Sequence, residues 1–262
     1  MNESIIQAAM KSADPMTAEL AFKEIETELS SLTDPCDQAA LLLHKAALYG
    51  KLNQFVKARK EISFALKAAP GDTDIIFQSE HLDALLYHEE QSVHEAFKRM
   101  TALLLKYALQ LKLPEYRAVY EDIQERRGFE LVQLLRFEEA IPILRECLSF
   151  EMQPEDRGEV LAYLGICYSH LKRYEEARDC FLQACEVGLM KQSQGLVHLQ
   201  LGIVYFHLNL LRESKRELQL SEQKPDESKF PIKKVYSWLS VVCRRLGARA
   251  EAESYARLAN PL

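Results

Sequence analysis

The sequence predicts an all-α protein built from about seven antiparallel helix pairs, and three observations carry this prediction. Apolar residues recur at helical spacing along almost the whole chain, and no stretch alternates with the period of two that a strand requires. Turn dipeptides such as Asp34-Pro35 and Pro70-Gly71 separate the helical segments. Small residues return in two columns with a nearly constant step, which is typical of a repeat architecture.

The first column of small residues lies on the first helix of each predicted pair and precedes the turn. Its members are Ala9, Ala46, Ala84, Gly128, Gly165, Gly202 and Ser240. The second column lies twelve residues later, on the second helix, at Ala21, Ala58, Ala96, Ala140, Ala177, Ser214 and Ala252. Both columns advance by 37, 38, 44, 37, 37 and 38 residues. Because a larger side chain would push two packed helices apart, we expect both columns where the helices of a pair approach most closely.

Each step of the columns defines one repeat of two helices. The repeats are expected near residues 2–38, 39–76, 77–120, 121–157, 158–194, 195–232 and 233–262, together forming a single domain over residues 1–262. The 44-residue step predicts lengthened helices from about 92 to 112 and from 115 to 135. Pro114 suits the first turn of the second of these helices, because its missing N–H would have no partner there. The third repeat also places Glu80 and Asp83 where apolar residues are expected.

Aromatic residues fill a further column, three positions after the first small residue. They are Tyr49, Tyr87, Tyr168 and Tyr205. The most regular repeat reads Leu161, Leu164, Gly165, Tyr168, Tyr174, Ala177, Phe181 and Ala184. This pattern resembles the tetratricopeptide repeat (TPR) over nearly the whole chain, although the repeats exceed the family's 34-residue period by a few residues. The resemblance implies a right-handed superhelical solenoid of about seven TPR-like antiparallel helix pairs, with armadillo-like hairpins as the alternative.

Composition and charge indicate a folded protein that does not bind polyanions. The chain has 48% apolar and 27% charged residues, and its net charge of -6 argues against nucleic acid as a partner. From Lys229 onward, however, the chain has seven basic residues and only two acidic ones, so we expect this end to attract anions. No apolar run is long enough to span a membrane, and the N-terminus lacks the basic and apolar regions of a signal peptide. We therefore expect a cytoplasmic protein with no membrane partner.

No motif predicts catalysis, a cofactor or a metal site. The sequence lacks GxxxxGK[ST], GxSxG and HExxH, and no GxGxxG follows a strand. His81 and His88 share a helix face but stand two turns apart, about 10 Å, which is too far for one metal ion. The six cysteines form no CxxC pair and are expected to be reduced thiols, with Cys147 and Cys243 in core columns. We expect no enzyme, no cofactor and no bound metal.

The resemblance places a binding groove on the concave face, which the first helices of the repeats line in TPR proteins. In the C-terminal half, this register interleaves rings with cationic or protonatable side chains, a composition typical of binding hot spots. The candidate peptide-binding residues are Arg126, Phe129, Tyr163, His170, Phe206, His207, Lys234, Trp238, Arg244 and Arg245. The Lys and Asn pair of the carboxylate clamp, known in chaperone-binding members, is absent, since Leu43 and Ala47 occupy matching positions.

These observations predict a non-catalytic scaffold that holds a partner protein or an acidic peptide in its groove. The alternative function is a regulatory sensor that changes curvature when it binds a small peptide or metabolite. On the last predicted helix, Tyr255 and Leu258 are expected to be exposed with no capping helix after them. Because apolar solenoid ends tend to associate, we also expect a weak homodimer through the C-terminal helix pair.

Overall fold

A computed structural model describes residue 9, residues 15–223 and residues 230–260. These residues form thirteen α-helices, two short 3-10 turns and no strand, which confirms the all-α prediction. Of the first helix of the first predicted repeat, only Ala9 is described. The chain divides into two compact units, an N-terminal unit (Met1–Tyr120) and a C-terminal unit (Glu121–Leu262). This division coincides with the predicted boundary between the third and fourth repeats, and a single domain over residues 1–262 stays a prediction.

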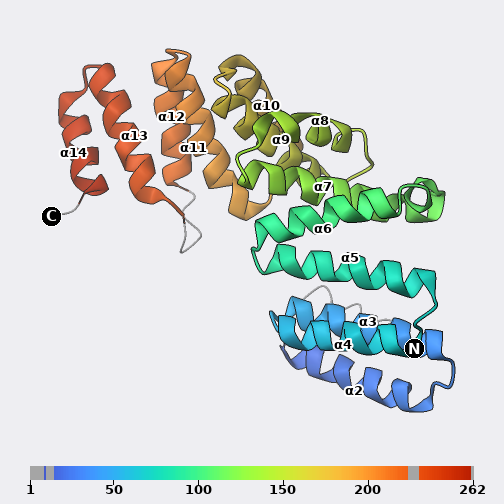
Figure 1. The fold of residues 1–262 in the computed structure, drawn as a ribbon. Coiled ribbons are helices and arrows are strands. Elements are labelled where there is room, and N and C mark those ends of the chain that lie inside the picture. The colour runs from blue at the N-terminus through green and yellow to red at the C-terminus, as the bar shows by residue number, and fades with distance from the viewer. Residues whose placement is uncertain (1–8, 10–14, 224–229, 261–262) are drawn as a thin grey trace. The chain divides into compact units, whose positions relative to one another are not determined.

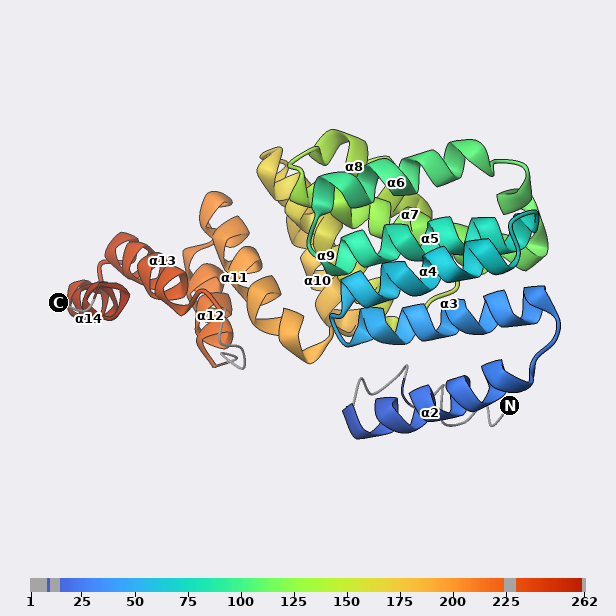
Figure 2. The ribbon, with the colours of Figure 1, turned by 60° about the horizontal axis from the view of Figure 1, so that its bottom comes forward.

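The N-terminal unit is a row of antiparallel helices in which consecutive helices lie side by side (Figures 1 and 2). The helices are α2 (Pro15–Ser31), α3 (Pro35–Lys51), α4 (Phe55–Ala68), α5 (Thr73–Glu89) and α6 (Val93–Lys106). Asp34 and Asp72 cap α3 and α5, because each side chain accepts backbone N–H groups of the first helical turn. The turn dipeptides predicted from the sequence therefore stand where helices begin.

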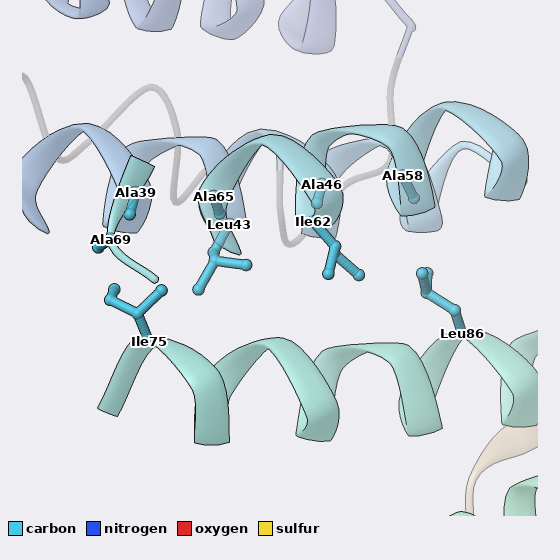
Figure 3. Packing of buried hydrophobic residues seen from close by; sticks show 9 residues of the cluster. All are labelled: Ala39, Leu43, Ala46, Ala58, Ile62, Ala65, Ala69, Ile75 and Leu86. Carbon is cyan, nitrogen blue, oxygen red and sulfur yellow. The ribbon is translucent and has the colours of Figure 1, made fainter. Parts of the chain in front are cut away.

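Alanines of both small columns lie in the core of this unit. Ala46 of α3 and Ala58 of α4 are fully buried, and they allow these two helices to pack closely. Ile75 and Leu86 of α5 point from the opposite side toward Leu43 and Ile62 (Figure 3). Each helix pair thus buries one face against its own partner helix and another against the next pair, as expected for stacked repeats.

The 44-residue step does not lengthen the helices as predicted. Helix α6 ends at Lys106, and the additional residues form two 3-10 turns, η1 (Gln110–Lys112) and η2 (Pro114–Tyr116). Pro114 begins η2, where its missing N–H is tolerated, and not the predicted α-helix, which begins at Arg117. The step gives the number of added residues but not their conformation, and among the residues of the two turns only Leu111 is buried.

Aromatic contacts hold these turns against α5. Tyr107 and Tyr116 contact Phe77 edge-on, with ring centroids 4.7 and 5.4 Å away. Glu80 accepts hydrogen bonds from the Lys106 ammonium at 2.6 Å and from the Tyr107 hydroxyl at 3.1 Å. A polar residue therefore stands at the Glu80 position because it binds the segment that follows α6.

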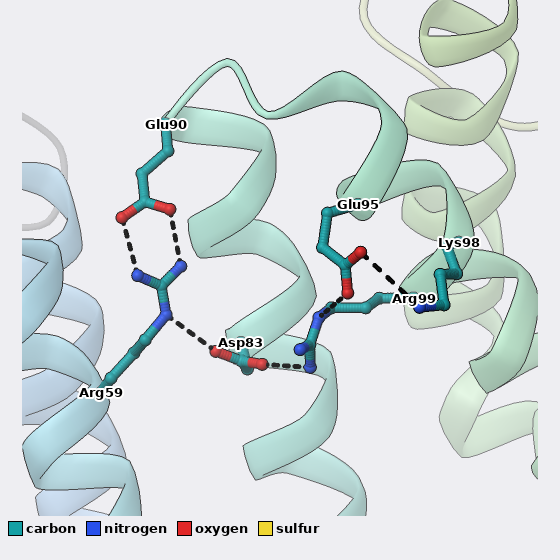
Figure 4. Close-up of polar contacts among 6 residues, drawn as sticks. All are labelled: Arg59, Asp83, Glu90, Glu95, Lys98 and Arg99. Carbon is teal, nitrogen blue, oxygen red and sulfur yellow. Dashed lines mark hydrogen bonds and ion pairs between the residues drawn. The ribbon is translucent and has the colours of Figure 1, made fainter.

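An ion-pair network explains the second unexpected polar residue, Asp83 (Figure 4). Its carboxylate lies between the guanidinium groups of Arg59 at 3.2 Å and Arg99 at 2.5 Å. Arg59 also binds Glu90 through two parallel hydrogen bonds of 2.7 Å. The two guanidinium groups lie 4.2 and 4.4 Å from the centre of the Tyr87 ring. The network joins α4, α5 and α6 through charges, in addition to the apolar contacts between α4 and α5.

The C-terminal unit contains four helix pairs (Figure 1). Their helices are α7 (Arg117–Gln133, which begins in the N-terminal unit), α8 (Phe137–Cys147), α9 (Pro154–His170), α10 (Tyr174–Val187), α11 (Lys191–His207), α12 (Leu211–Glu222), α13 (Ile232–Arg245) and α14 (Arg249–Ala259). We call α7, α9, α11 and α13 the first helices and the others the second helices. Cys147 and Cys243 are buried, as predicted.

The small columns of this unit lie at the closest approaches of the paired helices, as predicted. A Cβ atom on Gly165 would lie 2.7–2.8 Å from the Phe181 ring, and one on Gly202 would lie 2.7 Å from Leu218. The Ser214 hydroxyl donates a hydrogen bond of 2.7 Å to the Gly202 carbonyl. These positions exclude larger side chains because the second helix already fills the space.

A left-handed residue ends the first helix of each described pair from α3 onward, which the sequence did not lead us to expect. These residues are Asn53, Gln91, Leu135, Lys172 and Asn209, with φ between 57° and 61°, and Gly247, with φ of 80°. Each stands seven positions after the first small column. The next amide donates to a carbonyl at the end of the helix, as from Arg136 to Leu131 at 2.8 Å.

The last helix pair differs in part from the expectation. Leu258 is 48% exposed, as predicted. Tyr255 is half-buried, because its ring stacks on Tyr236 of α13 at 6.2 Å and packs against the core of the unit. The predicted exposure is therefore correct for Leu258 and wrong for Tyr255.

Candidate functional site

The first helices of the C-terminal unit carry four rows of side chains that share one side of each helix. Residues that lie four, seven and eleven positions apart share one face of a helix. The rows are Asp122, Glu159, Leu196 and Lys234; Arg126, Tyr163, Gln200 and Trp238; Phe129, Ile166, Ile203 and Val241; and Gln133, His170, His207 and Arg245. Each row advances by 37, 37 and 38 residues, as the small columns do. We call this surface the first-helix face.

Eight of the ten candidate residues lie on these rows, and ring contacts join neighbouring helices. Phe129 of α7 stacks on Tyr163 of α9, with ring centroids 4.2 Å apart. Burial raises the pKa of Tyr163, and the charge of Glu159 raises it further. This end of the face is therefore a half-buried aromatic surface beside a carboxylate.

A second group of rings, which we call the ring cluster, joins α11 and α13. It consists of Phe206, His207 and Trp238, whose centroids lie 5.3–6.2 Å apart. The Arg245 guanidinium lies 5.2 Å from the centre of Phe206. A cation over a ring is attracted by its π electrons, and the remaining donors of the guanidinium can bind a carboxylate.

Both candidate histidines stack on a ring of the preceding second helix. His170 lies 4.4 Å from Phe137, and His207 lies 4.5 Å from Tyr174, with nearly parallel planes in each pair. Both imidazoles remain exposed along one edge of the face. The sequence did not predict these partners, since each pair joins residues from different repeats.

Two candidate residues lie off the rows. Phe206 stands one position before His207 and packs between α11 and α13 against the core. Arg244 lines a pocket of about 210 Å³ together with Arg249, Ala252 and Glu253, at the side of α13 that meets α14. The sequence placed Arg244 and Arg245 in one groove. Successive side chains on a helix point about 100° apart, and the two arginines therefore lie on different surfaces.

The charge of the first-helix face changes sign between its two ends. Asp122 and Glu159 lie in the first row, and Asp122 pairs with Arg126 at 2.9 Å. Burial raises the pKa of Glu125, and the nearby charges of Asp156 and Asp122 raise it further.

At the other end, α13 carries basic residues at its first and last turns and no acidic residue. Lys234 and Arg245 are both exposed. The acidic end was missed in the sequence, although the same register that located Tyr163 also locates Asp122 and Glu159.

Two kinds of site receive no support from the residues that the structure describes. No group of three or more His, Cys, Asp or Glu side chains among residues 15–223 and 230–260 is placed to hold a metal ion. Within the same described part of the chain, no helix is both long and apolar enough to cross a membrane.

Comparison with known proteins identifies the repeat. A model of the tetratricopeptide repeat matches residues 158–187, which cover most of α9 and all of α10. No curated protein sequence matches the chain.

Among solved structures, PilF of Pseudomonas aeruginosa is similar with a TM-score of 0.63 and 15% identity, covering 87% of this chain and 95% of PilF. The apo form of RapI is similar with a TM-score of 0.73 and 14% identity, covering 97% of this chain and 73% of RapI. YrrB, described as a TPR protein with an unusual peptide-binding site, has a TM-score of 0.54 and 16% identity, covering 81% of this chain and 96% of YrrB. The likeness confirms the predicted all-α helical-repeat solenoid.

Proposed function

We propose that this chain, which carries a tetratricopeptide repeat and has the fold of TPR proteins, binds a partner peptide on its first-helix face. It acts as a scaffold and performs no chemistry on its ligand. The fold is typical of protein-binding modules, and YrrB is described as having a peptide-binding site. The six cysteines are free thiols, which accords with a cytoplasmic location, where thiols stay reduced.

The ring cluster is the observation that carries this proposal. Three rings from two helices meet beside Arg245, and Trp238 is only half-buried. Val241 and Leu196 lie in the two rows on either side of the row that contains Trp238, and they are 40% and 43% exposed. Partly exposed tryptophan and arginine beside apolar area are the residues that dominate binding energy at protein interfaces.

The ligand of this cluster is acidic or carries a carboxylate. Lys234 and Arg245 lie on either side of Trp238 along one face of α13. A charge-assisted hydrogen bond contributes roughly 1.5–3 kcal/mol, so loss of one such bond weakens binding about tenfold to a hundredfold. Charges at the edge are screened by salt over about 8 Å, whereas ring contacts are not. Binding is therefore expected to weaken with salt and yet persist.

Selection of peptides on the full chain tests the proposal. A phage-displayed library of 12-residue peptides supplies the probes, which are then synthesised with a fluorescent label for anisotropy titrations. Trp238 is the only tryptophan, so its emission reports binding independently. Trp238→Ala is expected to weaken binding at least tenfold. Leu182→Ala is the matched control, because Leu182 is 42% exposed on α10 and lies off the face.

The outcomes are distinct. Selected peptides that depend on Trp238 and are unaffected by Leu182→Ala support the proposal. Failure to select any peptide, or selected peptides that bind the Trp238→Ala variant as tightly as the original chain, would show that the binding surface lies elsewhere.

A further inference from the structure

We propose that the first-helix face selects a peptide with separated charges, whose acidic end lies over α13 and whose basic end lies over α7 and α9. This inference rests on the proposed function, and it adds the chemistry and the placement of the ligand. It goes beyond the acidic ligand expected from the sequence, because it assigns a role to carboxylates that the sequence-based site omitted.

The outer row of the face shows the change of charge most directly. Its members run from Asp122 on α7 through Glu159 on α9 and Leu196 on α11 to Lys234 on α13. Glu125 and Asp156 add negative charge at this end, since the charge of Asp156 raises the pKa of Glu125, and Arg126, which pairs with Asp122, offsets part of it. The row at the other edge of the face begins with the neutral Gln133 on α7 and ends with Arg245 on α13.

An apolar row connects the two charged ends. It consists of Phe129, Ile166, Ile203 and Val241, one residue from each first helix. Phe129 and Ile166 are half-buried and Val241 is 40% exposed, so these three side chains offer apolar contact to a ligand, whereas Ile203 is buried in the core below them. Neighbouring helix axes lie about 8–10 Å apart, so three steps from α7 to α13 span about 25–30 Å. An extended peptide of about eight residues covers this distance.

Glu159 supplies a second, independent indication of a ligand at the acidic end. Its Oε1 atom is buried and has no hydrogen-bond partner among the described residues. Hydrogen bonds from Ser193 and from the backbone of Met190 offset only part of its burial, and the pKa of Glu159 remains raised. A buried acceptor without a donor costs free energy, which a lysine or arginine of the ligand would recover. Such a cost is expected of a binding residue more than of a structural one.

Peptide selection with charge variants tests the placement. Peptides selected on the unmodified chain are expected to carry acidic residues at one end, basic residues at the other, and aliphatic or aromatic residues between. A probe of this kind is then compared with two synthetic versions, one with its acidic end neutralised and one with its basic end neutralised. Anisotropy titrations at about 0.15 M salt give the affinities.

Each end of the face has its own variant. Lys234→Gln/Arg245→Gln is expected to weaken the mixed-charge probe by about tenfold to a hundredfold and to leave the probe without acidic residues unchanged. Asp122→Asn/Glu159→Gln is expected to weaken the mixed-charge probe similarly and to leave the probe without basic residues unchanged. Glu186→Gln on α10 is the control, an exposed carboxylate off the face. Thermal melts verify that each variant is folded.

The results separate this inference from the proposed function. Peptides that depend on Trp238 but carry charge of one sign only, or charge variants that affect all probes equally, would overturn the inference while the proposed function stands. Absence of any Trp238-dependent peptide would overturn both.

Discussion

Gly158 and Gly165 stand where another part of the C-terminal unit leaves no room for a side chain. A Cβ atom on Gly165 would lie 2.7–2.8 Å from the Phe181 ring, and one on Gly158 would lie 1.7 Å from the Gly188 carbonyl oxygen. Gly165→Leu is therefore expected to lower the free energy of unfolding by about 1–3 kcal/mol. Gly158→Ala is expected to cost at least as much, because a backbone atom cannot rotate away.

Thermal and urea unfolding measure these changes, and Gly71→Ala is the control. A Cβ atom on Gly71 meets nothing within 4 Å. If Gly165→Leu melts like Gly71→Ala, the packing register assigned to the small columns is incorrect.

Leu135 holds a backbone conformation that suits it poorly. Its φ is 60°, and its side chain is 69% exposed, so no packing compensates for the strain. Asn53 and Asn209 occupy the same position in other repeats, and asparagine tolerates this conformation. Leu135→Asn is expected to raise the free energy of unfolding by about 0.5–1 kcal/mol, measured by urea unfolding. A decrease would mean that Leu135 makes a stabilising contact.

Carboxylates on different helices are expected to respond to pH with opposite signs. The hydrogen bonds of Arg59 lower the pKa of Glu90 from its ordinary 4.5, so its stabilising contribution is present above 4.5 and is lost as the pH falls through the lowered value. Burial raises the pKa of Glu159, so ionisation of Glu159 destabilises the fold, and this penalty disappears as the pH falls through the raised value.

Conservative variants measure both signs. At pH 7, Glu159→Gln is expected to stabilise the chain, and its advantage is expected to shrink as the pH approaches 4.5. Glu90→Gln is expected to destabilise the chain at pH 7, with a difference that vanishes only at more acidic pH. Urea unfolding between pH 3 and pH 7 gives the curves. Equal pH dependence of the two variants would contradict the assigned environments.

The molecule as a whole is expected to associate weakly through its last helix pair. Leu258 exposes 48% of its surface on α14, whereas Tyr255 is held against Tyr236 and contributes less than the sequence indicated. Light scattering is expected to show an apparent mass that rises with concentration, and Leu258→Glu is expected to abolish this rise. Leu182→Glu, at a similarly exposed position on α10, should not affect it. A strictly monomeric chain at high concentration would disprove the association.

The candidate site was only partly predictable. The sequence shows which side chains share one face of a helix, but not which side chains of other helices pack beside them. The repeat register predicts Tyr163 and Trp238 on one face, since helical spacing alone decides which side chains share a stripe. It did not place Arg244 or Phe206, whose positions lie about 100° from the face and depend on what packs beside the helix. The ring contacts of His170 and His207 join separate repeats, so the sequence did not predict them either.

The sequence by itself determined the helix pairs, their order and the positions at which they pack, because close approach of two helices limits side-chain volume at every repeat. Small residues therefore recur at a regular spacing in the sequence, as at Gly165 and Ala177. Only the tertiary structure decided that Glu80 and Asp83 are bound by cations, that the added residues form 3-10 turns and that Arg245 lies over Phe206. These outcomes depend on which distant segment lies beside each side chain. Ion pairs and ring contacts of this kind do not recur at a regular spacing, so the repeat pattern of the sequence does not reveal them.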